Sequence, residues 1–318
     1  MKKILLIFGF FFVAANAEAK ITILACEPEW YSLARQIVQD KADINLAVSA
    51  NQDAKNIEVK APLIAKARTA RIFFCNGGDL EARWLTTLIN KSYNLKAVTD
   101  KESVLFAYDY ADKIGGIDEP DFTMVGKKKF YKNGVRVHLN PNNITKIAAE
   151  FTKRVKKYDP INADFYQQSY ENFVKNWEVS IKKWEGRASA LKGMTFIAND
   201  NSWSYLGNWL GFKIITLSDQ ENGDKPDVVN LNDLAKSLKT APAEAIIFAG
   251  WENKKSLFWV RDTAKIRLVS LPFTVGGAAN SINLFMMFDT TVNSLLTDCS
   301  KGTCVTLSEP ENKKIKFK

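Results

Sequence analysis

The sequence predicts an α/β protein with two Rossmann-like βα lobes, whose parallel-rich sheets are joined by one long helix with a ligand cleft between the lobes. Three observations predict this fold. Short apolar runs alternate with amphipathic segments in the first half, the same alternation resumes in the second half, and a long proline-free segment separates them. We expect four parts: a signal peptide over 1–19, an N-terminal lobe over 20–160, a linking helix over 161–190 and a C-terminal lobe over 191–318.

The first residues have the pattern of a secretory signal peptide. Lys2 and Lys3 precede the apolar run Ile4–Val13, and small residues follow up to Ala17 and Ala19. Such a run is too short to span a bilayer comfortably, and the small residues match a cleavage site. We therefore expect cleavage after Ala17 or Ala19 and a periplasmic protein.

The first lobe is predicted from strands that each lead into a helix. The predicted strands are Ile21–Ala25, Ile44–Val48 and Arg71–Cys75, and the predicted helices are Glu29–Val38, Pro62–Arg68, Leu80–Leu88 and Asn142–Lys156. The segment from Tyr93 to Lys132 is rich in turns and charge, and its structure is left open. Strands that alternate with helices favour βαβ units on a parallel sheet.

The linking helix is the most distinctive predicted element. From Ala163 to about Ala190 there is no proline, and a mostly large, apolar series recurs at steps of three or four: Phe165, Ser169, Phe173, Trp177, Ile181 and Trp184. That spacing places them on one helical face. The segment is either an amphipathic surface helix or a rigid strut between two lobes.

A second βα series follows the linking helix. Its predicted strands are Met194–Ala198, Lys213–Leu217, Ala245–Phe248 and Arg267–Leu271, and its predicted helices are Trp203–Leu210, Leu231–Leu238, Lys254–Thr263 and Ser281–Leu296. Ligands of such sheets bind at the carboxyl ends of the strands, so we expect the cleft there.

Composition and charge exclude several classes of protein. The chain is 46% hydrophobic and 25% charged, which is usual for a globular protein. Its net charge of +9 is spread along the chain in short clusters. A nucleic-acid-binding protein would gather basic residues and stacking aromatic side chains on one face. We expect no nucleic-acid partner.

Four cysteines in an exported chain predict disulfides. Cys299 and Cys304 flank a short segment with a glycine, and we expect them to close a small loop. Cys26 and Cys75 each end a predicted strand. If the two strands are neighbours these cysteines form a second bridge, and otherwise they are buried thiols.

Several segments, read in order, resemble the zinc/manganese class of periplasmic solute-binding proteins of ABC transporters. They are Cys26-Glu-Pro-Glu-Trp30, Gln52-Asp-Ala-Lys-Asn-Ile-Glu58, Val137-His-Leu-Asn-Pro-Asn-Asn143, Ser202-Trp-Ser-Tyr-Leu206 and Leu271-Pro-Phe-Thr-Val-Gly-Gly277. The resemblance covers nearly the whole mature chain. It implies two lobes joined by one long helix, a zinc or other divalent metal ion as the transported ligand, and an ABC permease in the inner membrane as partner.

The metal ligands of the family are largely replaced in this chain. The resemblance places Lys55, within Asp53–Glu58, where the family has its first histidine ligand, and Arg136 where it has its second. Of that second motif, only His138 remains.

The other two ligand positions of the family lie in the second half of the chain. Asn199 and Asp200 stand at the third position, and Asp219 is the candidate for the acidic fourth ligand. We therefore take Lys55, Arg136, His138, Asn199, Asp200 and Asp219 as the cleft residues, with Asp53 and Glu58 supporting them. His138 and Asp200 are the candidate metal ligands.

These substitutions leave two hypotheses for the site. A protonated lysine or arginine has no lone pair for a metal and repels a cation. Lys55 and Arg136 therefore either pair with Asp200 and Asp219 and close the cleft internally, or bind an anionic or metal-complexed solute. The alternative to both is that these residues are exposed to solvent and the cleft is vestigial. The first hypothesis also predicts an alternative function, a metal-free adhesion or regulatory paralogue.

The sequence does not favour an enzyme. It has no Gly-x-Ser-x-Gly elbow, no phosphate-binding Gly-x-x-x-x-Gly-Lys and no His-Glu-x-x-His helix. His138 is the only histidine of the chain. General acid–base chemistry would therefore depend on carboxylates such as Glu27, Glu29 and Glu58.

Overall fold

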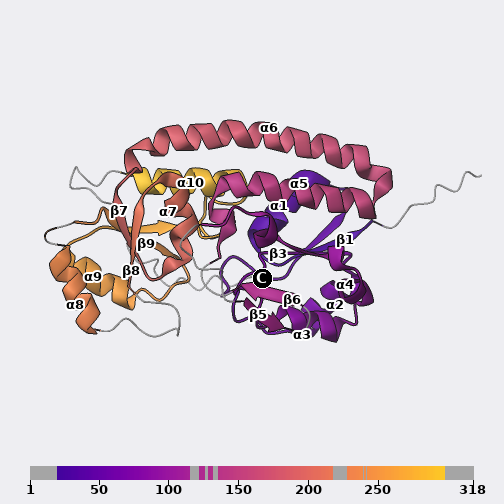
Figure 1. Ribbon diagram of the computed structural model, residues 1–318, viewed down its shortest axis with the longest axis horizontal. Helices are drawn as coiled ribbons and strands as arrows, with labels where there is room; N and C mark the ends of the chain where they lie inside the picture. The colour runs from indigo at the N-terminus through magenta and orange to yellow at the C-terminus, as the bar shows by residue number, and fades with distance from the viewer. Residues whose placement is uncertain are drawn as a thin grey trace, which may run out of the picture.

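The structure is a computed structural model that describes residues 20–114, 122–125, 128–131, 135–217, 228–238, 240 and 242–297. It contains two α/β lobes side by side, and a long helix runs along both of them (Figure 1). The predicted fold class is therefore confirmed. The expected signal peptide and the expected bridge between Cys299 and Cys304 lie outside the described residues.

The N-terminal lobe is built on a four-stranded parallel sheet with the order β2-β1-β3-β4. Its strands are β1 (Thr22–Ala25), β2 (Asp43–Leu46), β3 (Ile72–Cys75) and β4 (Val104–Phe106). Its helices are α1 (Pro28–Val38), α2 (Ala61–Thr69), α3 (Leu85–Ser92), α4 (Leu95–Thr99) and α5 (Pro141–Tyr158). The central strand β1 pairs Ile23 with Ile44 on one side and with Ile72 on the other. Strands flanked on both sides and covered by helices are uniformly apolar, as β1 and β3 are.

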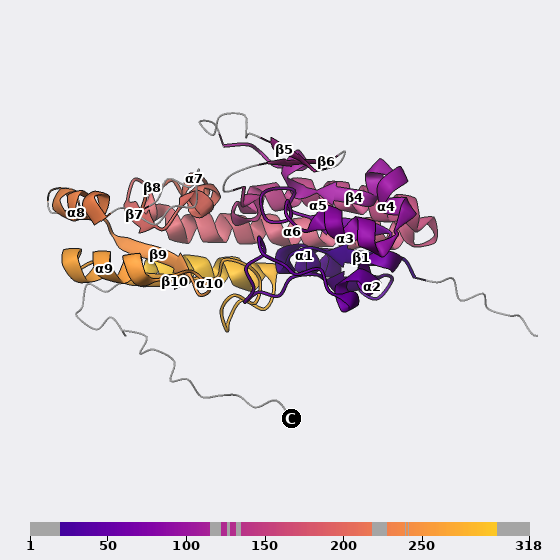
Figure 2. The same ribbon diagram turned by 90° about the horizontal axis from the view of Figure 1, so that it is seen from below.

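The segment between Tyr93 and Lys132 contains α4, β4 and a small antiparallel hairpin. The hairpin consists of β5 (Phe122–Val125) and β6 (Lys128–Tyr131). It lies at one edge of the N-terminal lobe when the molecule is seen from below (Figure 2).

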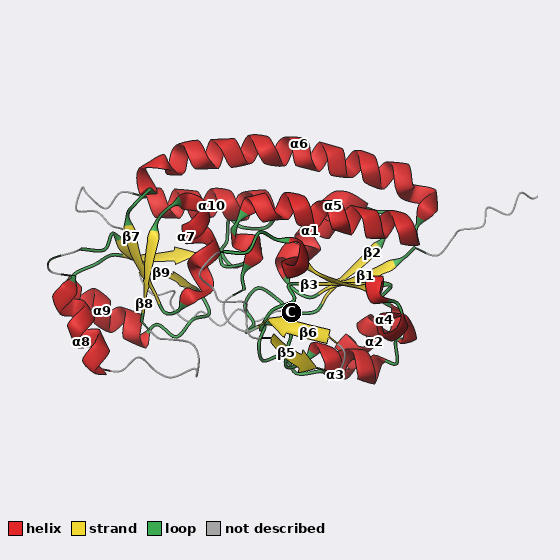
Figure 3. Ribbon diagram, viewed as in Figure 1, coloured by secondary structure: helices red, strands yellow, loops and turns green. Residues whose placement is uncertain are grey.

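The C-terminal lobe repeats the same plan with the strand order β10-β9-β7-β8. Its strands are β7 (Thr195–Ala198), β8 (Lys213–Thr216), β9 (Ala245–Ala249) and β10 (Leu268–Leu271). Its helices are α7 (Ser204–Leu210), α8 (Val228–Ser237), α9 (Lys255–Ala264) and α10 (Leu284–Leu296). All three strand pairs of this sheet are parallel. The carboxyl edge of each sheet is followed by loops that reach the region between the lobes (Figure 3).

The linking helix is α6 (Ala163–Ala188), and at 1.5 Å per residue its 26 residues span about 39 Å. Phe173, Trp177, Ile181 and Trp184 are buried on one face, as their spacing predicts. That face packs on α1 and α5 of the first lobe and on α10 of the second. Among the residues that the structure describes, every helix is too short or too polar to cross a membrane.

The segment after β3 differs from its prediction. A helix was expected over Leu80–Leu88, but residues 79–84 form turns and α3 begins at Leu85. Gly77 has a φ of 88°, and its N–H group donates to the Glu81 carboxylate. The Glu81 side chain thus bonds the backbone of the preceding loop, and such local side-chain bonds compete with helix formation.

Cys26 and Cys75 form a disulfide, so the prediction that left them either paired or free is resolved as paired. Cys26 follows β1 and Cys75 is the last residue of the neighbouring strand β3, and their Cα atoms are 4.8 Å apart. The bridge therefore ties together the carboxyl ends of two parallel strands, beside the region where the cleft was expected.

Candidate ligand cleft between the lobes

A pocket of about 430 Å³, counted out to its open mouth, lies between the lobes. Glu27, Lys55 and Arg136 line it from the first lobe, and Trp251 and Phe273 line it from the second. These residues follow the carboxyl ends of strands in both sheets, where ligands of parallel sheets bind. The pocket thus lies where the sequence placed the cleft.

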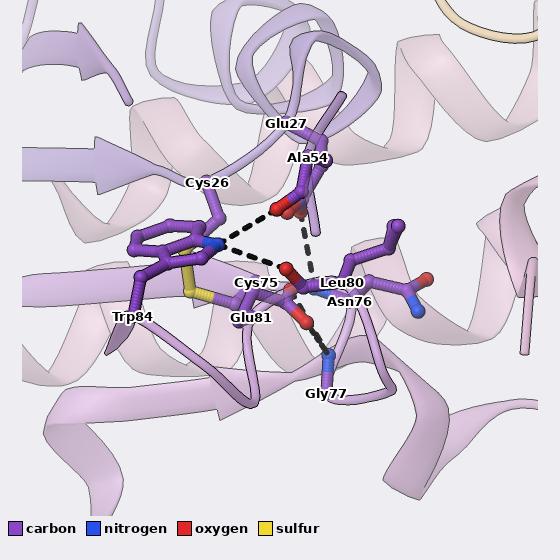
Figure 4. Close-up of a disulfide and its surroundings, with 9 residues drawn as sticks. All are labelled: Cys26, Glu27, Ala54, Cys75, Asn76, Gly77, Leu80, Glu81 and Trp84. Carbon is purple, nitrogen blue, oxygen red and sulfur yellow. Dashed lines mark hydrogen bonds between the residues drawn. A yellow bond between two sulfur atoms is a disulfide. The ribbon is translucent and has the colours of Figure 1, made fainter. Parts of the chain in front are cut away.

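The loop after β2 carries Lys55 into the pocket. The carboxylate of Asp53 accepts a hydrogen bond from the backbone N–H of Lys55 at 2.9 Å, which tightens a turn. The indole N–H of Trp84 donates to the carbonyl oxygen of Ala54 at 2.7 Å and to that of Leu80 at 2.8 Å (Figure 4). Asp53, the expected supporting residue, therefore shapes the loop that presents Lys55.

Lys55 and Arg136 meet at a carboxylate that the sequence did not single out. The Lys55 ammonium lies 2.8 Å from one oxygen of Asp79. The Arg136 guanidinium holds both oxygens of Asp79, at 2.5 and 3.2 Å. A bidentate contact of this kind is the strong form of an ion pair. We call these three residues the Asp79 cluster.

Within the Asp79 cluster, the negative charge of Asp79 and the positive charges of its partners stabilise one another. Burial alone would raise the pKa of Asp79, but the charges and hydrogen bonds of Arg136 and then Lys55 outweigh it and hold that pKa well below its ordinary value. Burial would likewise lower the pKa of Arg136, and Asp79 reverses this effect. Asp79 and Arg136 are therefore both charged at neutral pH.

His138 joins the two lobes beneath the pocket. Its Nε2 lies 2.8 Å from the carbonyl oxygen of Phe273, and its Nδ1 lies 3.2 Å from the Glu29 carboxylate. The other oxygen of Glu29 accepts a hydrogen bond from the Thr274 hydroxyl. A carbonyl oxygen only accepts, so Nε2 carries a proton. In this arrangement Nε2 offers no lone pair to a metal ion, and Nδ1 faces the Glu29 carboxylate.

Asn199 and Asp200 follow β7 in the second lobe, and neither is among the residues that line the pocket. The Asn199 amide donates to the Glu252 carboxylate at 2.6 Å. Asp200 accepts a hydrogen bond from the backbone N–H of Ser202 at 2.7 Å, and its charge also raises the pKa of Arg136. Burial, with the charge of Asp200, raises the pKa of Glu252 to about 7.

Comparison with known proteins assigns the chain to a protein family. The family model for the zinc-uptake complex component A, periplasmic, matches residues 23–297. The chain belongs to this family. It is a family of substrate-binding transport proteins rather than of enzymes.

Curated relatives are distant. A metal ABC transporter substrate-binding lipoprotein of Lactococcus lactis is 25% identical over 161 residues, which is 50% of this chain and 48% of that protein. The high-affinity zinc uptake system protein ZnuA of Bacillus subtilis is 21% identical over 69% of this chain and 67% of its own length. The zinc-binding lipoprotein AdcA of Streptococcus pneumoniae is 20% identical over 78% of this chain. The chain spans about half the length of the first and the last of these relatives.

Solved structures share the fold over most of the chain. A crystal structure of ZnuA superposes with a TM-score of 0.68 and 19% identity, and covers 87% of this chain and 100% of that one. The periplasmic zinc-binding protein TroA of Treponema pallidum superposes with a TM-score of 0.69 and 12% identity, covering 87% and 98%. At these identities the likeness concerns the fold.

The remaining predicted site residues lie elsewhere in this family member. The Glu58 side chain is 77% exposed and pairs with Lys60 at 3.0 Å, on the surface of the loop. Asp219 lies outside the described residues. The structure thus brings Lys55 and Arg136 together, sets Asp200 near enough to act on Arg136, and leaves Glu58 apart from them.

A buried pair of carboxyl groups lies at the floor of the pocket, and its role was not foreseen. The backbone N–H of Asn76 lies 3.3 Å from an oxygen of Glu27 and 2.5 Å from an oxygen of Glu81 (Figure 4). Burial, followed by the charge of Glu81, raises the pKa of Glu27 well above its ordinary value, and burial raises the pKa of Glu81 to about 7. One signal was available: like Asp79, both follow the carboxyl end of a buried parallel strand.

Proposed function

We propose that the chain is the exported solute-binding component of an ABC uptake system of the metal type. The observation that carries this proposal is the pocket between two parallel-sheet lobes, lined from both sides, in a member of the zinc-uptake component A family. A solute bound there would contact both lobes at once. The proposal assigns no catalytic step to the chain.

Location and partner follow from the same proposal. The N-terminal pattern of Lys2, Lys3 and a short apolar run supports export through a cleaved signal peptide and a periplasmic location. The names of the relatives, which include a metal ABC transporter lipoprotein and a zinc uptake protein, support an inner-membrane ABC permease as partner.

The charges in the cleft argue against a bare divalent cation at the inherited position. A zinc site needs about four neutral or anionic donors. Here Lys55 and Arg136 stand at two of the family's ligand positions, and both bind Asp79. At about 4 Å and an effective dielectric near 20, each such cation would cost a divalent ion about 8 kcal/mol. We therefore propose that the Asp79 cluster occupies the inherited metal position, and that the cargo is an anionic or metal-complexed solute.

A calorimetric titration tests the metal part of this proposal. We expect zinc and manganese to bind the oxidised wild-type chain more weakly than micromolar. The variant Lys55→His/Arg136→His should gain zinc affinity, because two cations become imidazole donors beside Asp79. Lys60→His/Arg261→His, at two exposed positions away from the pocket, is the matched control. Micromolar or tighter zinc binding by the wild type would contradict the proposal.

A capture experiment tests the solute part. The purified chain is dialysed against a small-molecule extract of its host, washed and denatured, and the released compounds are identified by mass spectrometry. We expect an anionic compound from the wild type and much less of it from Trp251→Ala, because the half-exposed Trp251 ring lines the pocket.

The Asp79 cluster also favours a second candidate, a metal-free adhesion or regulatory paralogue. Its ion pairs fill the first-lobe side of the cleft and satisfy both cations without any ligand from solution. Such a protein would release no compound in the capture experiment and would not copurify with an ABC permease from membranes. Copurification with a permease would support the uptake component and contradict the metal-free paralogue.

A further inference from the structure

The disulfide lies directly under the ligand cleft, in a group of acidic side chains. Cys26, Cys75 and Glu81 are fully buried. One ligand atom from each of the three lies within 4.8 Å of the others. Figure 4 shows the two bonded sulfur atoms with the Glu81 carboxylate near them. The strands fix it, because β1 and β3 are hydrogen-bonded neighbours that bring residues 26 and 75 together.

A fourth donor faces the same group. Glu27 is 3% exposed, and its Oε1 has no hydrogen-bond partner among the described residues. Its carboxyl end points toward Asn76 and Glu81. An unpartnered buried polar atom is costly unless something binds it. Glu27 also lines the pocket and so connects the buried group with the cleft.

We propose that the dithiol form of Cys26 and Cys75, together with Glu81, binds a thiophilic divalent cation such as Zn²⁺, with Glu27 as the fourth ligand. Thiolates and carboxylates are both zinc ligands, and four of them form the tetrahedral site that this ion prefers. The edges of a tetrahedron with 2.3-Å bonds are about 3.8 Å long. The two sulfur atoms, which are bonded to each other in the disulfide, would move apart to about this distance once the bridge is reduced.

The surroundings suit such a site. Trp84, Leu88 and Val48 belong to the apolar cluster that contains both cysteines, and the Trp84 ring lies beside the bridge (Figure 4). The Oε1 atom of Glu81 accepts from the N–H groups of Asn76 and Gly77, whereas of these two groups only Gly77 donates to the Oε2 atom, which keeps a lone pair for a cation. The positive charge of Arg136 acts on Glu81 and would offset the excess negative charge of the filled site.

Disulfide formation would empty the site. Cysteines are synthesised as thiols, and the two thiols lose two protons when the cation binds. A disulfide oxidant then takes two electrons from the two thiolates. The Cys26–Cys75 bond forms, the oxidant becomes two thiols by taking up two protons, and the cation is released. The redox state of one bridge would thus decide whether the cation is held beneath the cleft.

This inference does not rest on the proposed function. The solute-binding proposal concerns the oxidised chain and its open pocket, whereas the new site exists only when the bridge is reduced. Failure of either can be recognised separately, because the two are measured in different redox states of the same chain.

An anaerobic cobalt titration tests the inference. The full chain carries Cys299→Ser and Cys304→Ser, so that thiolate signals come only from Cys26 and Cys75, and a phosphine keeps it reduced. We expect one equivalent of Co²⁺ with a thiolate-to-cobalt charge-transfer absorption. The oxidised chain should give no such absorption, and a disulfide oxidant should abolish it in the loaded chain.

Two variants identify the carboxylate ligands. Glu81→Gln and Glu27→Gln should each weaken Co²⁺ binding at least about tenfold while keeping the charge-transfer band. Glu150→Gln, a largely buried carboxylate on α5 that pairs with Arg154, is the matched control and should bind as the parent does. No band in the reduced chain, an equal uptake by the oxidised chain, or loss of far-ultraviolet circular dichroism on reduction would each overturn the inference.

Discussion

Asp79 is the residue that changes the chemistry of the cleft. It receives both cationic side chains of the pocket, Lys55 and Arg136, and it is itself largely buried. Without Asp79, two positive charges would face each other in a poorly solvated pocket, which is unfavourable. Two cations at this place are therefore compatible with folding because a third side chain, from a different loop, neutralises part of their charge.

The raised pKa of Glu252 predicts a pH dependence of stability. In the unfolded chain this pKa is about 4.3, and in the folded protein it is about 7. Between these values the folded state binds more protons, so the free energy of unfolding falls as pH rises, by at most about 1.4 kcal/mol per pH unit. Glu252→Gln should flatten the profile measured by urea unfolding between about pH 5 and 8.

A matched control separates this effect from a general loss of charge. Glu58→Gln removes an exposed carboxylate and should leave the slope as it is in the wild type. Part of the slope should survive in Glu252→Gln, because the pKa values of Glu27 and Glu81 are raised in the same direction. An unchanged slope in Glu252→Gln would show that burial does not shift its titration.

The sequence indicated the cleft but not the pairing within it. Lys55 and Arg136 were predicted from positions in motifs, and motifs carry information about chain position only. Their partner, Asp79, lies in turns after β3 where a helix was expected. Which carboxylate reaches a given cation depends on the path of such a loop. Local sequence preferences do not determine that path when side-chain contacts such as Glu81 to Gly77 shape it.

At the scale of elements, α6 joins the lobes through an aromatic face. Trp177 stacks on Phe173 and meets Trp184 edge-on, with ring centroids 5.3 Å apart in both pairs. It also contacts Phe288 on α10, while its indole N–H donates to the carbonyl oxygen of Pro141 on α5 at 2.9 Å. One side chain therefore touches elements of both lobes.

Replacing Trp177 by alanine should strongly destabilise the folded protein. Trp177 is fully buried, and Trp177→Ala removes a large ring and leaves the Pro141 carbonyl without its donor. We expect a loss of about 3–5 kcal/mol in the free energy of unfolding, measured by urea denaturation. Val179 lies two residues further along the same helix and is 66% exposed. Val179→Ala should therefore change the free energy of unfolding by less than about 0.5 kcal/mol. Equal losses in the two variants would contradict the packing role of the aromatic face.

Periodic elements were the part of the fold that the sequence predicted well. The 3.6-residue spacing in α6 and the uniformly apolar strands β1, β3 and β9 each follow from burial of one face or of both. Short elements such as α4 and the β5–β6 hairpin escaped prediction. These elements are too short to show a clear hydrophobic period, and the sequence around them is rich in turn-forming residues.

At the scale of the whole molecule, one cluster of buried apolar side chains spans both lobes. It contains Ile23 and Trp30 of the first lobe, Trp177 of α6, and Phe196 and Leu271 of the second, and each lobe also has a smaller cluster of its own. Two separate cores connected by a flexible linker would let each lobe unfold independently. The shared cluster instead couples the stability of the two lobes, with α6 packed along both of them on α1, α5 and α10.

A shared core predicts one cooperative unfolding transition. Hydrogen exchange followed by mass spectrometry, with rising urea, should give the same free energy of opening for β1 in the first lobe and β9 in the second. Trp177→Ala should lower both values together, since its ring packs against both lobes. Val179→Ala should lower neither. Two transitions, or a fall in only one lobe, would mean that α6 is a tether between independent domains, so that cleft closure involves free movement of the lobes rather than small shifts about a common core.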